Sequence, residues 1–147
     1  MNLVKLNSSL VEFAFECQKE LRGDVYYSLQ DWSNYLVDNQ LFESNEFQIF
    51  VGVVDNAPVG ILTCNRYSIP RYLGFGIELE EVVIHPEYQQ RGYAVSLINK
   101  FIESIVSDND IRKLSVKTDD KIVASRLYQK IFQSIELNVF SKKINLL

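Results

Sequence analysis

The sequence predicts an α/β protein with a mixed sheet that carries helices on both faces. Apolar stretches of strand length alternate along the chain with longer stretches of helical periodicity, and turn residues separate the two kinds. Strands and helices interleaved in this order are typical of a mixed sheet covered on both sides. The 147 residues suit a single domain, 1–147, which would bury about two thirds of the surface that its unfolded chain exposes.

The N-terminal third is expected to hold one strand and two helices. A short strand at 3–6 precedes the polar run 7–9, which can cap a first helix, and the apolar residues of that helix recur at spacings of three and four until Gly23. Asp24 is expected to cap the second helix. An apolar and aromatic stripe marks this second helix, and core packing is its simplest explanation: Tyr26, Tyr27, Leu29, Trp32, Tyr35 and Leu36.

The remaining elements are predicted from turns and periodicity. Strands at 47–54 and 59–64 flank the turn DNAP and form a hairpin, residues 65–74 form a loop or an irregular strand extension, and a strand returns at 75–84. A strand is also expected at 111–116. A last helix, capped by Asp119 or Asp120, should run to about Phe132, and a closing strand should span Ile135 to Phe140 or beyond.

The segment 82–94 carries the most specific signal. Its strand ends in three β-branched residues, a composition that suits burial on both faces, and Pro86 has no amide hydrogen to continue the ladder. Apolar residues at helical spacing follow Ala94, so a helix begins around Gly92 to Ala94.

The loop 89–93 therefore lies at a helix start and is expected to bind an anion. The first four amides of a helix have no partner inside it, and the helix dipole favours a negative charge there by ~0.3–1 kcal/mol. Gly92 allows close approach of the backbone, and Arg91 adds a permanent positive charge. A pyrophosphate would fit, although many loops with one glycine before a helix bind nothing.

The same segment resembles the acyl-coenzyme A signature of the GNAT superfamily of N-acetyltransferases. In that signature a valine-like residue, any residue and a proline end the strand, and Gln/Arg-x-x-Gly-x-Gly/Ala follows. The matching residues are Ile84, His85, Pro86, Gln89, Gln90, Arg91, Gly92, Tyr93 and Ala94. The resemblance implies that the loop 89–94 and the backbone of Val82, Val83 and Ile84 bind acetyl-CoA.

The order of the predicted elements is also similar to the GNAT fold. The resemblance implies a central, mostly antiparallel sheet whose fourth and fifth strands splay apart, with the pantetheine arm of the cofactor lying in the gap like an added strand. It further implies that the acceptor pocket is built after the first helix. The aromatic stripe of the second helix is then either core or a wall of that pocket.

Transfer of an acetyl group to an amine requires a base, because an ammonium group has a pKa of about 10.4 and only its neutral form attacks. Strand alternation puts Glu78 and Glu80 on one face and Glu81 on the other, unless a bulge shifts the register. Related enzymes place a base at the positions that match Glu80 or Glu78, and Glu80 is the first candidate. The alternative is that these glutamates only pair with Arg66 or Arg71.

The segment ASRLYQKIF resembles the Ala-x-x-Leu-Tyr-x-Lys segment of the last GNAT helix. The resemblance implies that Tyr128 donates a proton to the departing thiolate, and an ordinary core tyrosine is the alternative. Two positions depart from the family: Lys121 replaces an asparagine, and Phe132 with Gln133 replaces a glycine-phenylalanine pair. His85, the single histidine, is expected to be structural.

Composition excludes several classes of protein. A net charge of −4 argues against binding to nucleic acid. No apolar run approaches the ~20 residues of a membrane span, and the N-terminus lacks a secretory pattern, so a cytoplasmic protein without a membrane partner is expected. Cys17 and Cys64 are expected to be buried thiols. Because the chain has one histidine and no CxxC motif, no metal site is predicted.

The sequence thus predicts an N-acetyltransferase that transfers an acetyl group from acetyl-CoA to a primary amine of a small molecule or peptide, by direct attack in a ternary complex. The main alternative is a degenerate GNAT-like domain that binds coenzyme A as a sensor or scaffold without catalysis. A plain interaction module without a cofactor is the other. An exposed closing strand would allow a homodimer.

Overall fold

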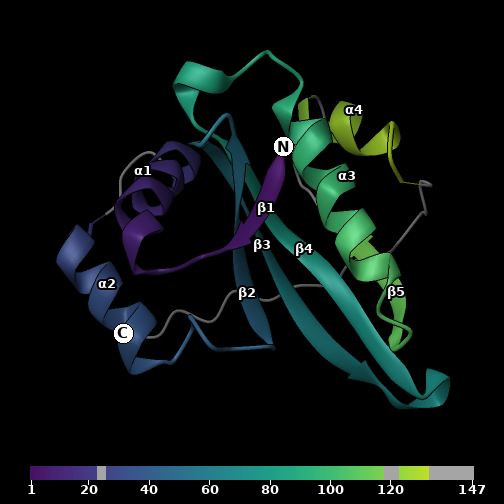
Figure 1. Cartoon of the computed structure of the whole chain (residues 1–147). Helices are drawn as coiled ribbons and strands as arrows, with labels where there is room; N and C mark the ends of the chain where they lie inside the picture. Colours follow the sequence, from purple (N-terminus) through teal and green to yellow (C-terminus); the bar gives the residue numbers. More distant parts are fainter. Residues whose placement is uncertain (23–25, 118–122, 133–147) are drawn as a thin grey trace. The chain divides into compact units, whose positions relative to one another are not determined.

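The computed structural model describes residues 1–22, 26–117 and 123–132. The chain divides into two compact units, Met1–Lys117 and Thr118–Leu147. The first unit holds the sheet (Figure 1) and consists, in chain order, of β1 (Asn2–Lys5), η1 (Ser8–Leu10), α1 (Val11–Arg22), α2 (Leu29–Asp38), β2 (Phe47–Val54), β3 (Ala57–Ile69), η2 (Pro70–Tyr72), β4 (Gly74–Ile84), η3 (Pro86–Tyr88), α3 (Tyr93–Val106) and β5 (Ile111–Val116). The second unit contains α4 (Val123–Gln129).

The described strands form one sheet in the order β1-β2-β3-β4-β5. The first four strands pair antiparallel with their neighbours, and β5 alone pairs parallel to β4. The predicted mixed, mostly antiparallel sheet is therefore confirmed. A parallel neighbour needs a crossover connection, which α3 provides between β4 and β5.

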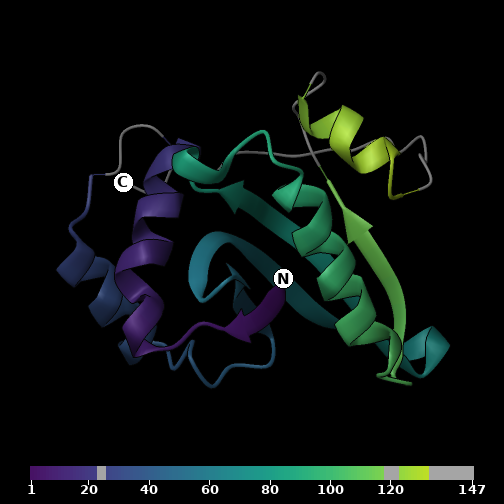
Figure 2. The same ribbon diagram turned by 45° about the horizontal axis from the view of Figure 1, so that its top comes forward.

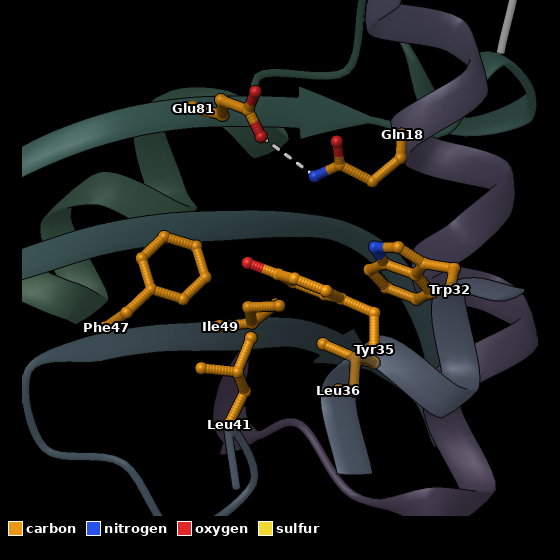
Figure 3. Close-up of a pocket in the computed structure, with 8 residues that line it drawn as sticks. All are labelled: Gln18, Trp32, Tyr35, Leu36, Leu41, Phe47, Ile49 and Glu81. Carbon is orange, nitrogen blue, oxygen red and sulfur yellow. Dashed lines mark hydrogen bonds between the residues drawn. The ribbon is translucent and has the colours of Figure 1, made fainter. Parts of the chain in front are cut away.

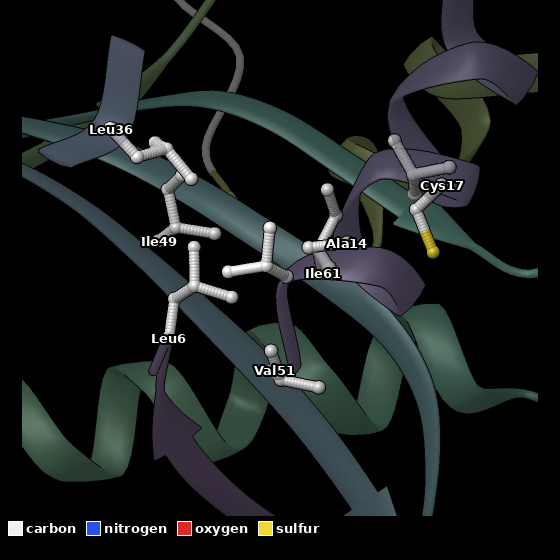
Figure 4. Close-up of a cluster of buried hydrophobic side chains, with 9 residues drawn as sticks. Leu6, Ala14, Cys17, Leu36, Ile49, Val51 and Ile61 are labelled. Carbon is white, nitrogen blue, oxygen red and sulfur yellow. The ribbon is translucent and has the colours of Figure 1, made fainter. Parts of the chain in front are cut away.

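Helices cover both faces of this sheet, as predicted (Figures 1 and 2). On the face of α1 and α2, a core of buried apolar side chains joins these helices to the strands (Figure 4). The core includes Leu6, Ala14, Cys17, Leu36, Ile49, Val51 and Ile61. On the other face α3 buries Leu97, Ile98 and Phe101, and the Phe101 ring centroid lies 5.4 Å from that of Phe50.

The hairpin is longer than expected. Its turn is shorter than the predicted DNAP: Asp55 and Asn56 form it, with φ values of 50° and 64° as a two-residue type I′ turn requires, and Ala57 and Pro58 already belong to β3. However, β3 continues to Ile69, so most of the expected loop 65–74 is strand. The extension pairs with the first residues of β4, and Ile69 lies opposite Gly74. The local sequence of the extension does not reveal this pairing partner.

The start of α2 differs from the prediction. Its N-cap is Ser28 rather than Asp24, which lies outside the described residues, and Tyr26 and Tyr27 precede the helix. Ser28 and Asp31 form a reciprocal capping box: the Ser28 hydroxyl accepts a hydrogen bond from the Asp31 amide at 3.1 Å, and the Asp31 carboxylate accepts one from the Ser28 amide at 2.9 Å. These bonds satisfy backbone amides at the helix end. The helix therefore begins after Ser28, although the apolar stripe continues upstream of this residue.

The C-terminal half of the first unit agrees with the prediction. Gly92 is the N-cap of α3, and β5 spans the predicted residues 111–116. In the second unit α4 ends at Gln129, earlier than expected, and a turn follows to Phe132. The remaining expectations for this unit lie outside the described residues: the caps Asp119 and Asp120, the departures Lys121 and Gln133, and the closing strand.

Removal of the capping box should destabilise the first unit. We expect Ser28→Ala to lower the free energy of unfolding by about 1 kcal/mol, because an N-cap hydroxyl is lost. Ser33→Ala in the interior of the same helix is the matched control, and it should be neutral or stabilising because alanine is the better helix former there. Chemical denaturation monitored by circular dichroism measures both. Equal stability of the two variants would contradict a structural role for the box.

Candidate active site

A β-bulge in β4 decides where its three glutamates lie. Cys64 of β3 pairs with Leu79 and Thr63 pairs with Glu81, which leaves Glu80 without an opposite residue. Because Asn65 pairs with Glu78, the bulge puts Glu78 and Glu81 on the same face. The exception for a bulge therefore applies: Glu81 shares a face with Glu78 because the register shifts. The common face expected for Glu78 and Glu80 is not contradicted, since Asn65, which lies opposite Glu78, also donates to Glu80.

Each of the three glutamates has a different partner. Glu78 forms an ion pair with Lys117 at 2.7 Å, and this bond raises the pKa of the Lys117 ammonium. Glu80 is exposed and accepts a hydrogen bond from the Asn65 side chain at 2.7 Å. Glu81 accepts one from the Gln18 side chain at 2.8 Å. The carboxylates are thus held by three separate elements.

The two arginines expected to pair with these glutamates have other neighbours. The Arg66 guanidinium lies 3.7 Å from the Asp108 carboxylate, and it stacks over the Phe75 ring at 4.0 Å from the centroid. Arg71 stacks over the ring of Tyr72. These contacts stabilise the far end of the β3–β4 hairpin, away from Glu81.

A cavity of about 240 Å³ lies under Glu81, on the sheet face that α1 and α2 cover. Its lining residues are Gln18, Trp32, Tyr35, Leu36, Leu41, Phe47, Ile49 and Glu81. Figure 3 shows the Gln18–Glu81 hydrogen bond on one side of the cavity, with the Tyr35 ring across its middle. The sequence did not single out Gln18, Leu41, Phe47 or Ile49, because residues from four elements meet here only in the folded chain.

The aromatic stripe is divided between its two interpretations. Leu36 is buried in the core and also lines the cavity, Trp32 packs against the core and lines the cavity with Tyr35, and Tyr26 is 97% exposed. The wall of a pocket is therefore built after the first helix, and it uses only part of the stripe.

One edge of β4 has no neighbour beyond the bulge in the described part of the chain. β5 pairs with β4 from Phe75 to Leu79 and ends at Val116, which lies opposite Leu79. His85 donates its amide to Val59 of β3, and the Val83 carbonyl also faces β3 at Gly60. Because backbone groups alternate along an antiparallel strand, the amides and carbonyls of Val82 and Ile84 face the open edge. The Ile84 carbonyl accepts a hydrogen bond from the Gln89 side chain at 3.0 Å.

The loop that follows presents free amides at the start of α3. Gln90 and Gly92 adopt left-handed φ values of 61° and 77°, and the first helical hydrogen bond runs from the Ser96 amide to the Gly92 carbonyl at 3.2 Å. The amides before Ser96 therefore have no partner within the helix. A Cβ atom added to Gly92 would meet nothing within 4 Å, so the space in front of the helix is open. The geometry fits the predicted pyrophosphate cradle.

Residues 8–132 match the model of the Acetyltransferase (GNAT) family. The chain belongs to the GNAT acetyltransferase family. The match spans the open edge of β4, the cradle and α4, and it confirms the resemblance seen in the sequence. No curated protein matches the chain significantly.

Solved structures share the fold of this GNAT acetyltransferase. A ribosomal-protein-alanine N-acetyltransferase from Brucella melitensis biovar Abortus 2308 has a TM-score of 0.78 at 14% identity, with 98% of this chain and 99% of that chain covered. An aminoglycoside acetyltransferase from an uncultured soil metagenomic sample, in complex with trehalose, also has a TM-score of 0.78 at 17% identity, over 99% of this chain and 95% of that one.

A third structure is called a transcriptional regulator, from Bacillus halodurans C-125. It has a TM-score of 0.79 at 13% identity and covers 97% of this chain and 99% of that chain. At such identities the likeness shows the fold alone.

Three further residues of this acetyltransferase carry titratable groups of interest. His85 stacks on Phe13 at 5.6 Å between ring centroids, in agreement with a structural role. Cys17 and Cys64 are buried and free, as expected, and burial raises the pKa of each thiol to about 12. Both thiols are therefore protonated at neutral pH, and neither is available as a nucleophile.

Tyr128 belongs to the second unit. It lies on α4 and makes an edge-to-face contact with Phe132 at 6.1 Å between ring centroids. Burial raises the pKa of the Tyr128 hydroxyl above its usual value of 10.0. The hydroxyl consequently stays protonated throughout the neutral range.

Within residues 1–22, 26–117 and 123–132, no helix is long and apolar enough to cross a membrane. The same described residues contain no group of three or more His, Cys, Asp or Glu side chains that could hold a metal ion.

Proposed function

We propose that this GNAT family member is an N-acetyltransferase that transfers an acetyl group from acetyl-CoA to a primary amine by direct attack in a ternary complex. One observation carries the proposal: the open edge of β4 at Val82 and Ile84 leads directly into a cradle of unpaired amides at the start of α3. A strand-like arm with hydrogen-bonding amides and a terminal diphosphate matches this combination of edge and cradle.

Donor binding is assigned to the sequence-predicted residues. Backbone groups of Val82 and Ile84 would bind the pantetheine amides, and Val83 would support them by holding β4 on β3. The loop residues Gln89, Gln90, Arg91, Gly92, Tyr93 and Ala94 would surround the diphosphate. The bound donor supplies an acyl carbon activated as a thioester.

The chain's side chains would then move the protons. Glu80 accepts the proton that the amine must lose, directly or through a water molecule, and Glu78 is the second candidate. The pairing of Glu78 with the Lys117 ammonium supports this order, because a cation competes with a proton for the carboxylate. As the C–N bond forms and the C–S bond breaks, Tyr128 donates a proton to the sulfur, and a backbone amide near Ile84 stabilises the negative oxygen.

Direct transfer, without a covalent enzyme intermediate, is supported by the two cysteines. Both are buried with a pKa raised to about 12, so neither supplies a thiolate at neutral pH. The family match across residues 8–132 supports one domain that includes both units. A cytoplasmic location belongs to the same proposal and is supported by the composition alone. Release of free thiol in the presence of amines distinguishes the enzyme from a coenzyme A sensor, which would bind without turnover.

The placement of the diphosphate can be tested at Gly92. We expect Gly92→Glu to abolish the rise in melting temperature that acetyl-CoA causes, because a carboxylate would stand beside the phosphates. Gly92→Gln is the matched control, since it carries the same left-handed strain, roughly 1–2 kcal/mol, without the charge. For the wild type, a ligand at 100 times its dissociation constant should stabilise the protein by about 2.7 kcal/mol.

Differential scanning fluorimetry with and without acetyl-CoA gives this comparison. The open space around Gly92 means that both variants should fold. If Gly92→Glu binds acetyl-CoA with the affinity of the wild type, the diphosphate does not lie at this helix start.

The assignment of the base can be tested by pH–rate profiles. We expect Glu80→Gln to reduce kcat/KM on the order of 10²-fold or more and to change its dependence on pH, because positioned general bases contribute ~10²–10⁴-fold. Glu78→Gln should change the profile less. Thiol release between pH 6 and 10 measures both, and unchanged profiles in the two variants would locate the base elsewhere.

The role of Tyr128 predicts a separation of turnover from binding. Tyr128→Phe should lower kcat on the order of 10²-fold and leave the thermal shift with acetyl-CoA intact, since only the hydroxyl is lost. Because the pKa of Tyr128 is raised, ionisation of this group should not reduce the wild-type rate until the pH exceeds 10.0. A variant with wild-type turnover would remove Tyr128 as the acid.

A further inference from the structure

We propose that the cavity under Glu81 binds the acceptor, and that it selects a compact primary amine with one positive charge on an apolar or aromatic body. Glu81 would hold the ammonium group, and the aromatic walls would hold the body. This inference rests on the proposed function, and it adds the substrate class and a specificity-determining residue that strict alternation would place on the opposite face.

The charge of the cavity favours a single cation. Glu81 is the one charged side chain among its lining residues. Its carboxylate is oriented by Gln18, a buried side chain that donates to Oε2 at 2.8 Å. A carboxylate held in a partly apolar cavity binds an ammonium group more strongly than it would in water, because the screening by solvent is weaker.

A second polar group, Thr63, lies between two of the lining residues, although it does not itself line the cavity. Thr63 pairs across the strands with Ile49 on one side and Glu81 on the other, so its side chain shares their face. It is 1% exposed, and its hydroxyl has no hydrogen-bond partner in the described part of the chain. Buried hydroxyl groups are normally satisfied, and an ammonium N–H donated to Thr63 would supply the missing bond.

Size and walls favour an apolar body. The volume of about 240 Å³ is smaller than the ~300–1,000 Å³ typical of pockets for drug-sized ligands. Six of the eight lining residues are apolar, and three of these are aromatic: Trp32, Tyr35 and Phe47. A polyamine or an aminoglycoside carries several positive charges, each of which needs its own partner when it leaves water, and this cavity offers one carboxylate.

The position of Glu81 also suits the reaction. It directly follows the bulge at Glu80, and the described pairing of β4 with β5 ends before it, at Leu79. The next residue, Val82, presents its backbone to the open edge at which the donor arm is proposed to lie. An amine held by Glu81 is therefore next to both the proposed base and the proposed acyl donor.

A panel of amines tests the selectivity. With acetyl-CoA and thiol detection, kcat/KM for 2-phenylethylamine and 3-methylbutylamine should exceed that for spermidine and kanamycin by at least about 10-fold, the factor that one lost hydrogen bond to a charged group produces. A higher kcat/KM for spermidine or kanamycin would overturn the inference.

Two variants test the residues. Glu81→Gln should raise the KM for 2-phenylethylamine about 10-fold to 100-fold, with a smaller change in kcat and an unchanged thermal shift with acetyl-CoA. Glu43→Gln, at an exposed loop position, is the matched control and should behave as the wild type.

Thr63→Val should raise the same KM several-fold, although the protein without ligand should be as stable as the wild type or more stable, because an unsatisfied hydroxyl is removed. An unchanged KM in Glu81→Gln would overturn the inference. If Glu81→Gln does not fold, an unchanged KM in Thr63→Val would overturn it.

Calorimetry separates this inference from the proposed function. If no amine releases thiol and acetyl-CoA causes no thermal shift, the proposed function fails. In that case 2-phenylethylamine should still bind the wild type with a lower Kd than Glu81→Gln, and the absence of binding at millimolar concentration would overturn the cavity assignment as well. If thiol release occurs with equal KM values in the wild type and in Glu81→Gln, only the inference fails.

Discussion

The bulge at Glu80 is the constraint on which the candidate site depends. Without the extra residue, strand alternation would direct Glu81 toward the face of α3, where Leu97, Ile98 and Phe101 are buried. A carboxylate among these side chains would lose its hydration without gaining a partner. The inserted residue instead puts Glu81 on the face of α1, within 2.8 Å of the Gln18 amide. One backbone irregularity thus converts a strand glutamate from a liability into a partner for a cation.

The same strand carries two functions because its two sides differ. One edge of β4 remains on β3 through Ile84, whereas the other edge is paired with β5 only as far as Leu79. The free edge offers backbone groups for an extended ligand, and the face toward α1 offers the Glu81 carboxylate. A donor on the edge and an acceptor on the face would meet at the bulge.

Features of the fold and the site could be predicted where the residues that determine them are close together in the sequence. The start of α3 at Gly92 and the strand 111–116 were predicted correctly, because glycine before helical periodicity and a short apolar run are local signals. Residues 65–74 could only be predicted as a loop or an irregular strand extension, because the pairing partner that makes β3 continue to Ile69 begins at Gly74, beyond a turn. The bulge could not be predicted either, since no residue type marks it. Strict alternation over 78–81 puts Glu81 on the face opposite Glu78, and only a register shift, which the sequence leaves open, brings the two to one face.

This distinction also bears on acceptor choice in the family. The cradle consists of consecutive residues at one helix start, so a short motif can specify it. The cavity is assembled from α1, α2, β2 and β4, and each lining side chain can change without disturbing the sheet register or the cradle. The proposed donor and acceptor sites would then have separate determinants. The determinants of the amine are thus expected in the tertiary contacts around Glu81, where one carboxylate, one orphan hydroxyl and three aromatic rings converge, rather than in any contiguous motif.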